Sequence, residues 1–543
     1  MAESDEKTGP VQRRSVTADD KKTEAIASTG PGNSEREDDI GLEKVTSVDM
    51  AKKDHMDYNR VDKEVAEYVA DVHVEIDEET NKRLKKMIDR RVLVIMILTY
   101  FLQALDKGTI SFTAIMNLPK DTGLHGQQFS WLTTCIYIAV LIVEYPTNWI
   151  IQRVPIAKYL GINIICWGAV LSLHAACKNF ASLVAVRTLL GIFEACCQPS
   201  FVILSSLWYK RSEQADAVTY WYMMNGGQQI VGGLLAYCFT LIKTGPLKAW
   251  QALFIAYGCF TVLYGIFVLL WMPDSPMRAK CFTEADKRLM VERVRSNQTG
   301  LQNRKFRKEQ MIEGFLDPQT WGYCMIQICT TLPTSGLGAF ANIIIVSFNF
   351  TKLETQLLAM VLGFYIIIVL LSSAFLVRKT GQNLIIMGAF VIPSFIGTIV
   401  LMTVENTNMG TKIGLLISYY ITLSFWSAQT LTLSMVSRNI AGQTKKATVV
   451  AATFVAWAVG NAIGPQVFLE WNKPRYFIAF AVHLGCYSIL LLVIFGLRWH
   501  LSRQNKIKDK WAAERGEEGT DKGLVHAFDD LTDRENMNFR YIF

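Results

Sequence analysis

Twelve long apolar segments dominate this 543-residue chain and restrict the folds open to it. Each segment is long enough for a helix to cross about 30 Å of hydrocarbon. A helix satisfies its backbone hydrogen bonds within the segment, so we expect an all-α membrane protein. The predicted spans form two sets of six, at 92–114, 128–151, 158–177, 181–207, 217–242 and 250–272, and at 322–348, 354–377, 383–404, 411–436, 446–469 and 476–499.

The polar segments outside these spans divide the chain into regions. Residues 1–60 lack an apolar stretch of signal-peptide length and are too polar to form a core, so we expect disorder there. The predicted regions are a cytoplasmic tail at 1–91 with a candidate surface helix, a six-helix bundle at 92–272, a cytoplasmic linker at 273–320, a second six-helix bundle at 321–500 and a cytoplasmic tail at 501–543. Two such bundles are typical of transporters that rock about a central cavity.

Basic residues are unevenly distributed between the predicted loops. With both termini in the cytoplasm, about thirty Lys and Arg flank the spans on the inner side and about seven on the outer side. The net charge is +7, but no basic stripe interleaved with aromatic residues lies outside the spans. We therefore expect contact with a lipid bilayer and no nucleic acid.

The cysteines and motifs argue against redox, metal or enzyme chemistry. Ten of the eleven cysteines fall inside apolar segments, and no pair has the C-x-x-C spacing, so we expect reduced, packed thiols. The sequence contains no nucleotide-binding loop, metal-ligand ladder or catalytic triad. We predict no cofactor, no metal, no enzymatic activity and a monomer.

Ionisable side chains inside the hydrocarbon are costly, so each is a candidate functional residue. They are confined to the amino-terminal half, since the carboxyl-terminal spans contain essentially no charge. The candidates are Asp106 and Lys107 in the first span, Glu144 in the second, His174 in the third, and Arg187 and Glu194 in the fourth.

Depth along the helices relates Asp106 to Arg187. The first span runs outward and the fourth inward, which puts both residues roughly 10 Å below the outer surface at about 1.5 Å per residue. One interpretation is a structural Asp106–Arg187 ion pair. The other is that the planar guanidinium of Arg187 binds a substrate carboxylate in a bidentate manner. The sequence leaves both open.

Glu194 lies two turns deeper than Arg187, on nearly the same helix face. Desolvation favours its neutral form, so it can load and release a proton; the alternative is a helix-packing hydrogen bond. Glu144 lies beside Pro146 and Asn148 near the inner end of its span, where a role in gating or loop anchoring is expected. His174 is expected to be an interfacial residue rather than part of a proton relay.

Uncharged polar and aromatic residues of the second half are candidate cavity linings, although most aromatics at helical spacing serve packing. Asn461 is favoured because it precedes Gly464 and Pro465, where a helix of small residues can break and act as a hinge. The full set is Asn342, Gln429, Asn461, Gln466, Trp426, Trp457 and Tyr365.

Several segments carry a family resemblance. In order they are YFLQALDKGTISFTAI (100–115), EYPTNWIIQRVPIAK (144–158), RTLLGIFEACCQP (187–199), WQALFI (250–255), MPDSP (272–276), FTKLETQLL (350–358), GQTKKATVVAATFVAWAVGNAIGPQ (442–466) and DDLTDRENMNFRY (529–541). Together they cover nearly the whole membrane domain. The chain resembles the major facilitator superfamily and, within it, the fungal allantoate-permease branch of the anion:cation symporter family.

This resemblance implies proton-coupled uptake of a small organic anion or related nutrient, such as a ureide, a vitamin or its precursor, or an amino-acid derivative, across a fungal plasma membrane. The motif R-x-x-x-G-x-x-E also resembles the vesicular glutamate and sialic-acid branch, where it is tied to anion recognition and coupling. Only Arg187, Gly191 and Glu194 match it. Of the superfamily's acidic, glycine-rich signature, Arg153 and Lys158 remain and the customary Asp is absent.

The candidate site thus has two parts. Candidate substrate-binding or coupling residues are Arg187, Glu194, Asp106, Lys107, Asn461 and Gln429; candidate gating or structural residues are Glu144, Arg153, Lys158, Gly464 and Pro465. Three alternatives remain at this stage: a nutrient receptor with this fold, a proton-exchanging exporter of drugs or secondary metabolites, and, more distantly, a membrane enzyme.

Overall fold

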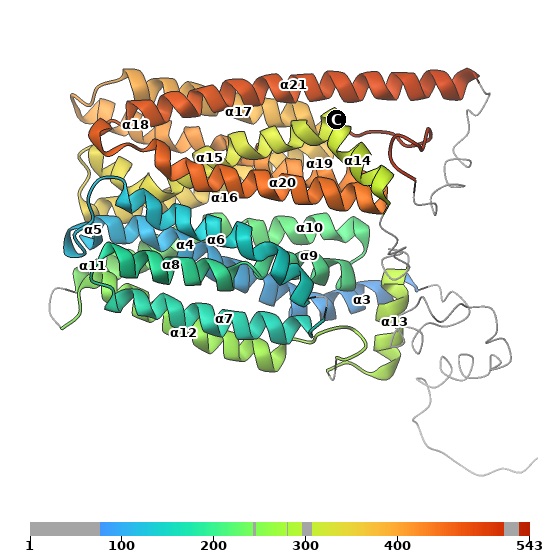
Figure 1. Ribbon diagram of the computed structural model, residues 1–543, viewed down its shortest axis with the longest axis horizontal. Helices are drawn as coiled ribbons and strands as arrows, with labels where there is room; N and C mark the ends of the chain where they lie inside the picture. Colours follow the sequence, from blue (N-terminus) through green and yellow to red (C-terminus); the bar gives the residue numbers. More distant parts are fainter. Residues whose placement is uncertain (1–75, 152, 243–245, 280, 296–306, 515–530) are drawn as a thin grey trace, which may run out of the picture. The chain divides into compact units, whose positions relative to one another are not determined.

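A computed structural model describes residues 76–151, 153–242, 246–279, 281–295, 307–514 and 531–543. Within these ranges the chain forms helices and no strand (Figure 1). This confirms the predicted all-α fold class. Residues 1–75 of the predicted tail at 1–91 lie outside the described residues, so the candidate surface helix near 61–91 is described only from residue 76 onward.

The amino-terminal half begins with a short helix that leads into the first span. Its elements are α3 (Glu78–Ile88), the π-helical turn η2 (Asp89–Leu93), α4 (Val94–Ile115), α5 (Leu118–Asp121), α6 (Gln128–Ile151), α7 (Ile156–Leu173), η3 (His174–Ala176), α8 (Phe180–Glu194), α9 (Cys197–Trp208), α10 (Arg211–Tyr222), α11 (Met224–Leu241) and α12 (Ala249–Trp271).

Two linker helices precede the carboxyl-terminal half. They are α13 (Glu284–Arg295) and α14 (Lys308–Leu316). The second half comprises α15 (Pro318–Ser347), α16 (Lys352–Thr380), α17 (Asn383–Thr403), α18 (Met409–Thr422), η4 (Leu423–Phe425), α19 (Trp426–Asn439), α20 (Gln443–Ile463), η5 (Gly464–Val467), η6 (Glu470–Asn472) and α21 (Phe477–Glu514).

Nine helical runs of the described residues are long and apolar enough to cross a membrane. The other three predicted spans correspond to α4, to α10 with α11, and to α18 with α19. Helix α4 is continuous but contains Gln103, Asp106 and Lys107. The other two are each interrupted, at Met223 and at the 3-10 turn η4. Polar content and helix breaks therefore distinguish these three predicted spans from the other nine.

The surface of the helical bundle is apolar and its interior contains polar groups. Leu270 is 81% exposed and Leu492 is 73% exposed, whereas Asp106 and Arg187 are buried. Apolar side chains on the surface can contact lipid at little free-energy cost. The buried ionisable groups face other helices instead of lipid. The arrangement fits a multi-pass membrane protein.

Helices α11 and α16, which belong to different halves, cross at two glycines. A Cβ atom on Gly226 would lie 2.7 Å from the carbonyl oxygen of Gly363, and one on Gly363 would lie 2.5 Å from the carbonyl oxygen of Gly226. Small residues of this kind let two membrane helices approach closely. The main chains of the two halves are therefore so close at this crossing that no side chain fits between them.

Side-chain hydrogen bonds between the halves gather at one end of the bundle. We call the end that carries α3 and the polar end of α21 the tail-side end, and the opposite one the far end. At the far end Thr134 donates to the carbonyl of Ala462 (2.8 Å), and Gln466 donates to the Thr134 hydroxyl (2.9 Å). Gln127 donates to the Gln466 carbonyl (3.2 Å). These contacts close the far end between α6, α20 and η5.

The tail-side end has a weaker connection between the halves. Arg378, in the last turn of α16, forms an ion pair with Asp216 of α10, and both side chains are substantially exposed. Exposed ion pairs contribute little to stability. The described contacts therefore hold the halves together more firmly at the far end.

Candidate substrate and coupling site

Four ionisable side chains of α4 and α8 lie within the amino-terminal half. The Lys107 ammonium lies 3.4 Å from a carboxylate oxygen of Glu194. The Glu194 side chain is fully buried, whereas that of Lys107 is 27% exposed. Lys107 therefore connects a buried carboxylate with accessible space. The sequence identified both residues but did not pair them.

Asp106 has a different partner from the one expected. The indole N–H of Trp167, on α7, donates to one carboxylate oxygen of Asp106, and the other oxygen has no hydrogen-bond partner within the described part of the chain. No ion pair joins Asp106 to Arg187 among the described residues, so the Asp106–Arg187 interpretation is wrong. The equal depth of Asp106 and Arg187 was not enough to predict a pair, because a third helix, α7, supplies Trp167 as the partner of Asp106.

Arg187 is 1% exposed, yet part of its guanidinium is unsatisfied. Its Nε and one Nη have no hydrogen-bond partner within the described ranges. The guanidinium carbon lies 6.0 Å from the centroid of the Phe254 ring, which offers only a weak contact. A buried charge without full compensation is costly, so these donors can bind an anion once it reaches them.

His174 is fully buried, which corrects its expected place at the interface. Its ring stacks on Phe254 at a centroid distance of 4.7 Å. Its Nδ1 lies 3.2 Å and 3.1 Å from the carbonyl oxygens of Val170 and Leu171. His174 and Arg187 thus share Phe254 as a neighbour. Hydropathy could not reveal this, because it does not report which helix covers a residue.

Gly191 explains how α8 presents Arg187 and Glu194. A Cβ atom at Gly191 would lie 2.7 Å from the Ile136 carbonyl oxygen of α6. Only glycine permits this contact without a shift of the helices. The motif R-x-x-x-G-x-x-E thus places a close helix contact between the two ionisable residues.

The second-half candidates are mostly engaged in packing. The side-chain amide of Asn461 donates to the main-chain carbonyl of Trp457 (2.8 Å). The main-chain carbonyl of Asn461 accepts from the Ser335 hydroxyl (2.7 Å). The Gln429 carbonyl oxygen is buried and has no hydrogen-bond partner in the described ranges. The side chain of Gln429 therefore has a free hydrogen-bond acceptor within the described ranges, whereas the side-chain amide of Asn461 is bonded to a carbonyl of its own helix, α20.

The remaining polar linings also make specific contacts. Asn342 contributes its main-chain N–H to the Ser111 hydroxyl (3.2 Å), and the Tyr365 hydroxyl lies 2.6 Å from that of Ser424. Trp426 has a buried indole nitrogen without a hydrogen-bond partner in the described ranges. These groups belong to the packed interior.

Aromatic rings connect the two halves near these residues. The Trp457 ring meets the Tyr137 ring of α6 edge-on at 5.6 Å and stacks on Phe454 at 5.3 Å. Sequence reasoning did not identify Tyr137. The residues around an aromatic side chain on an apolar helix do not show whether it faces the other half of the protein or lipid.

Arg153 and Lys158 lie near the junction of α6 and α7, whereas Glu144 lies inside α6. Arg153 stacks over the Trp149 ring at 3.7 Å, and Lys158 is exposed. Glu144 is half-buried in α6, beside Pro146 inside the helix, and the Asn148 side chain lies outside the described atoms.

Helix α20 ends at Ile463, and the chain continues as the 3-10 turn η5 over Gly464 and Pro465. A Cβ atom on Gly464 would lie 2.3 Å from the Leu332 carbonyl oxygen, so this break packs tightly against α15.

Sequence reasoning also missed one structural carboxylate. Asp274, within the segment MPDSP, accepts the main-chain N–H of Ala157 (3.0 Å) at the start of α7. A carboxylate at a helix start satisfies free N–H groups and the helix dipole. No group of three or more potential metal ligands occurs among the described residues.

Comparisons with known proteins agree with this architecture. Residues 96–465 match the family model described as Major Facilitator Superfamily. The chain is 34% identical to the thiamine pathway transporter of Saccharomyces cerevisiae, over 86% of this chain and 87% of that protein. It is 31% identical to the allantoate permease of the same yeast, over 93% and 95% of the two chains.

A solved structure has a similar fold. It is a bacterial homolog of the human lysosomal transporter Spinster in an inward-facing, unoccupied conformation. The TM-score is 0.53 at 15% identity, over 78% of this chain and 95% of that one. At this identity the likeness concerns the fold alone.

Proposed function

We propose that this chain, which belongs to the major facilitator superfamily and is a secondary transporter of small organic substrates, takes up an organic anion or related nutrient together with protons. The substrate class is that of a ureide, a vitamin or precursor, or an amino-acid derivative. Support comes from relatives named as an allantoate permease and a thiamine pathway transporter. The observation that carries the proposal is the Lys107–Glu194 pair together with the unsatisfied donors of Arg187, two turns away on the same helix.

The coupling step follows from competition for Lys107. A substrate carboxylate that approaches the partly exposed Lys107 side chain attracts its ammonium away from Glu194. Once unpaired, the buried Glu194 carboxylate is strongly disfavoured and takes up a proton. Substrate and proton then cross together. On release of the substrate, Lys107 returns to Glu194 and the proton leaves.

Arg187 is the second cation of the proposed anion site. Its planar guanidinium can bind a carboxylate through two donors, which a lysine ammonium cannot reproduce. Because Arg187 is 1% exposed, the anion reaches it only after the surrounding helices move. Movement of the bundles is therefore part of binding as well as of release.

Alternating access and orientation form part of the same proposal. We assign the tail-side end to the cytoplasm of a fungal plasma membrane, with both termini there. Arginines stack on tryptophans at this end, with Arg91 3.9 Å from the Trp271 ring centroid and Arg153 near Trp149. Basic residues favour the cytoplasmic side, and tryptophans mark either membrane interface. The closed far end would then make this the inward-facing state.

The test begins with uptake by an uptake-deficient host on a panel of sole nitrogen sources and vitamins. The substrate found is then followed in proteoliposomes under an imposed pH gradient. We expect Glu194→Gln to abolish proton-driven accumulation while some exchange remains, and Arg187→Lys to reduce uptake at least tenfold. Glu405→Gln and Arg475→Lys, in an exposed ion pair, are matched controls that should behave as wild type.

Two results would contradict the proposal. Unchanged accumulation by Glu194→Gln would show that this carboxyl does not carry the coupling proton. Substrate movement outward whenever protons move inward would identify an exporter instead.

A further inference from the structure

We infer that residues 532–543 are a clasp, a carboxyl-terminal segment that binds a site built by α14, α15, α19, α20 and α21 and fixes the tail-side end of the carboxyl-terminal half. The clasp returns to the helical bundle and ends beside α19 and α21 (Figure 1).

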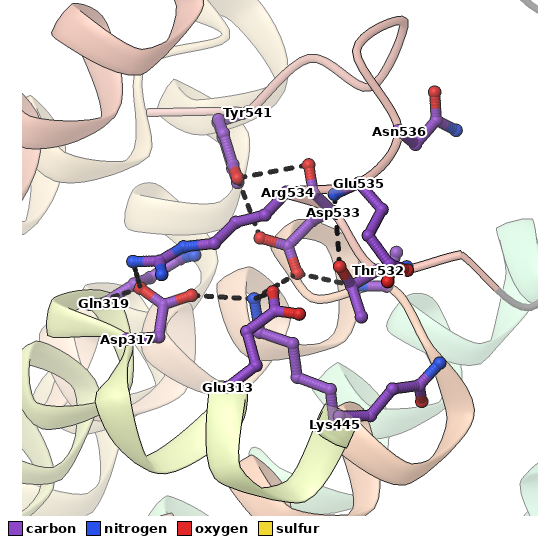
Figure 2. Close-up of polar contacts among 12 residues, drawn as sticks. Glu313, Asp317, Gln319, Lys445, Thr532, Asp533, Arg534, Glu535, Asn536 and Tyr541 are labelled. Carbon is purple, nitrogen blue, oxygen red and sulfur yellow. Dashed lines mark hydrogen bonds and ion pairs between the residues drawn. The ribbon is translucent and has the colours of Figure 1, made fainter. Parts of the chain in front are cut away.

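The centre of the clasp site is a buried lysine surrounded by carboxylates. The Lys445 ammonium lies 2.7 Å from Asp533 of the clasp, 2.8 Å from Asp317 and 3.0 Å from Glu313 (Figure 2). The side chains of Lys445 and Asp533 are both fully buried. Lys445 is in the first turn of α20, where the helix dipole disfavours a cation. The surrounding carboxylates therefore compensate both burial and the dipole.

The clasp also folds upon itself around Asp533. The Tyr541 hydroxyl donates to the Asp533 carboxylate at 2.8 Å (Figure 2). The main-chain N–H of Glu535 donates to the Thr532 hydroxyl (3.2 Å), and the N–H of Thr532 donates to the Glu535 carboxylate (2.9 Å). Lys508 of α21 donates to the main-chain carbonyls of Asp533 and Asn536. The Asp533 side chain is therefore held in the orientation that reaches Lys445.

Two asparagines bind the main chain at the end of the clasp. Asn505 of α21 accepts the N–H of Tyr541 (2.9 Å) and donates to its carbonyl (2.8 Å). Asn439 of α19 does the same for Ile542, at 2.8 Å and 2.7 Å. Consecutive residues of the clasp are thus held by different helices. These four bonds depend on the main chain, whereas the Asp533–Lys445 contact depends on the side chain.

Among the described residues, the polar partners of the clasp lie in the carboxyl-terminal half. Its polar partners there include Lys445 of α20, Asp317 at the start of α15, Asn439 of α19, and Asn505, Lys508 and Asp509 of α21. The other linker helix, α13, is attached to the amino-terminal half, where buried Arg293 meets Glu213 at 2.6 Å and Asn81 at 2.7 Å. The clasp therefore fixes the base of α20, whose other end contacts α6, rather than closing a gate between the halves.

Hydrogen exchange of the purified full-length protein tests this inference without a substrate. We expect the main-chain amides of Tyr541 and Ile542 to be protected in the wild type. Asp533→Asn should raise their exchange rates at least tenfold and lower Tm. Arg540→Ala removes only exposed contacts, an ion pair with Asp509 of α21 and hydrogen bonds to the Met537 and Phe539 carbonyls, and should leave the exchange of Ile542 unchanged. Asn505→Ala, which keeps the buried charges intact, should release Tyr541 selectively.

A second measurement adds the clasp as a separate peptide to a protein that lacks it. A variant lacking residues 531–543 should have a lower Tm, and an excess of the synthetic peptide 531–543 should restore part of it. The same peptide carrying Asp533→Asn should not. Wild-type exchange in both Asp533→Asn and Asn505→Ala would overturn the inference. So would a deletion variant with unchanged Tm, or equal stabilisation by the two peptides.

Discussion

The ammonium of Lys107 lies 3.4 Å from the carboxylate of Glu194, and α4 and α8 of the same half supply the two side chains. A pair within one half moves with that half as a body, so it is not broken by rocking alone. Only a competing charge, either a substrate anion or a proton, separates it. This is the physical basis of the proposed coupling.

Replacing Lys107 with Met should destabilise the protein through Glu194. Removal of one partner of a buried ion pair costs about 3–5 kcal/mol, and the partial exposure of Lys107 places the expected loss at the lower end. Transport should be lost. The double variant Lys107→Met with Glu194→Gln should recover most of the Tm but not the transport, because the buried charge is removed. Additive losses of Tm in the double variant would contradict the pairing.

Replacing Gly226 with Ala should impair the contact between the halves. The added methyl would lie 2.7 Å from the Gly363 carbonyl oxygen and 2.5 Å from an Ile367 side-chain carbon, and overpacking of this kind costs about 1–3 kcal/mol. We expect a lower Tm and slower transport. Gly485→Ala in α21 is the control, because no atom lies within 4 Å of the added position. Equal behaviour of the two variants would show that the crossing tolerates a side chain.

Asp121 should give the far end an acid-sensitive contact. Burial raises its pKa, but hydrogen bonds from Lys248 (2.9 Å) and the Trp250 indole (2.8 Å) outweigh burial, so the pKa of Asp121 lies below its ordinary value. A depressed folded pKa stabilises the protein above the unfolded pKa of about 3.9, and this stability is lost as pH falls through the folded pKa.

The corresponding measurement compares Tm of the wild type and Asp121→Asn across pH. The wild type should be more stable from pH 5 to pH 7, by about the same margin throughout, and the margin should shrink below about pH 4. Lys352→Met, which removes a far-end hydrogen bond to Asn117 without a carboxylate, is the control and should show no such dependence. A margin that grows toward low pH would contradict the assignment.

The family and fold class were predictable from local features of the sequence. Hydropathy predicted the spans, nine of which are helical runs apolar enough to cross a membrane. The residues that interrupt the apolar pattern, such as Asp106 and Glu194, were recognised as candidates for the same reason. Even the split crossings at Met223 and at Leu423–Phe425 fall within predicted spans. The sequence did not show that each of these two spans is broken into two helices, because helix breaks depend on how neighbouring helices pack.

The partners of the candidate residues were not predictable. Asp106 pairs with Trp167, 61 positions away, and Lys445 pairs with Asp533 of the clasp. Lys445 had one usable signal, since a lysine in the first turn of a helix opposes the helix dipole and calls for a nearby acid. Trp167 had none, because an indole on an apolar helix looks the same whether it faces lipid or a carboxylate.

The sequence by itself determined which segments are apolar enough to cross a membrane and which of them carry charge, because the cost of placing a group in hydrocarbon depends on that group and its near neighbours along the helix. Only the tertiary structure decided that Lys107 pairs with Glu194, that Arg187 keeps unsatisfied donors and that the clasp binds Lys445. Those outcomes depend on which helices lie side by side, and helix packing brings together side chains that no local pattern relates.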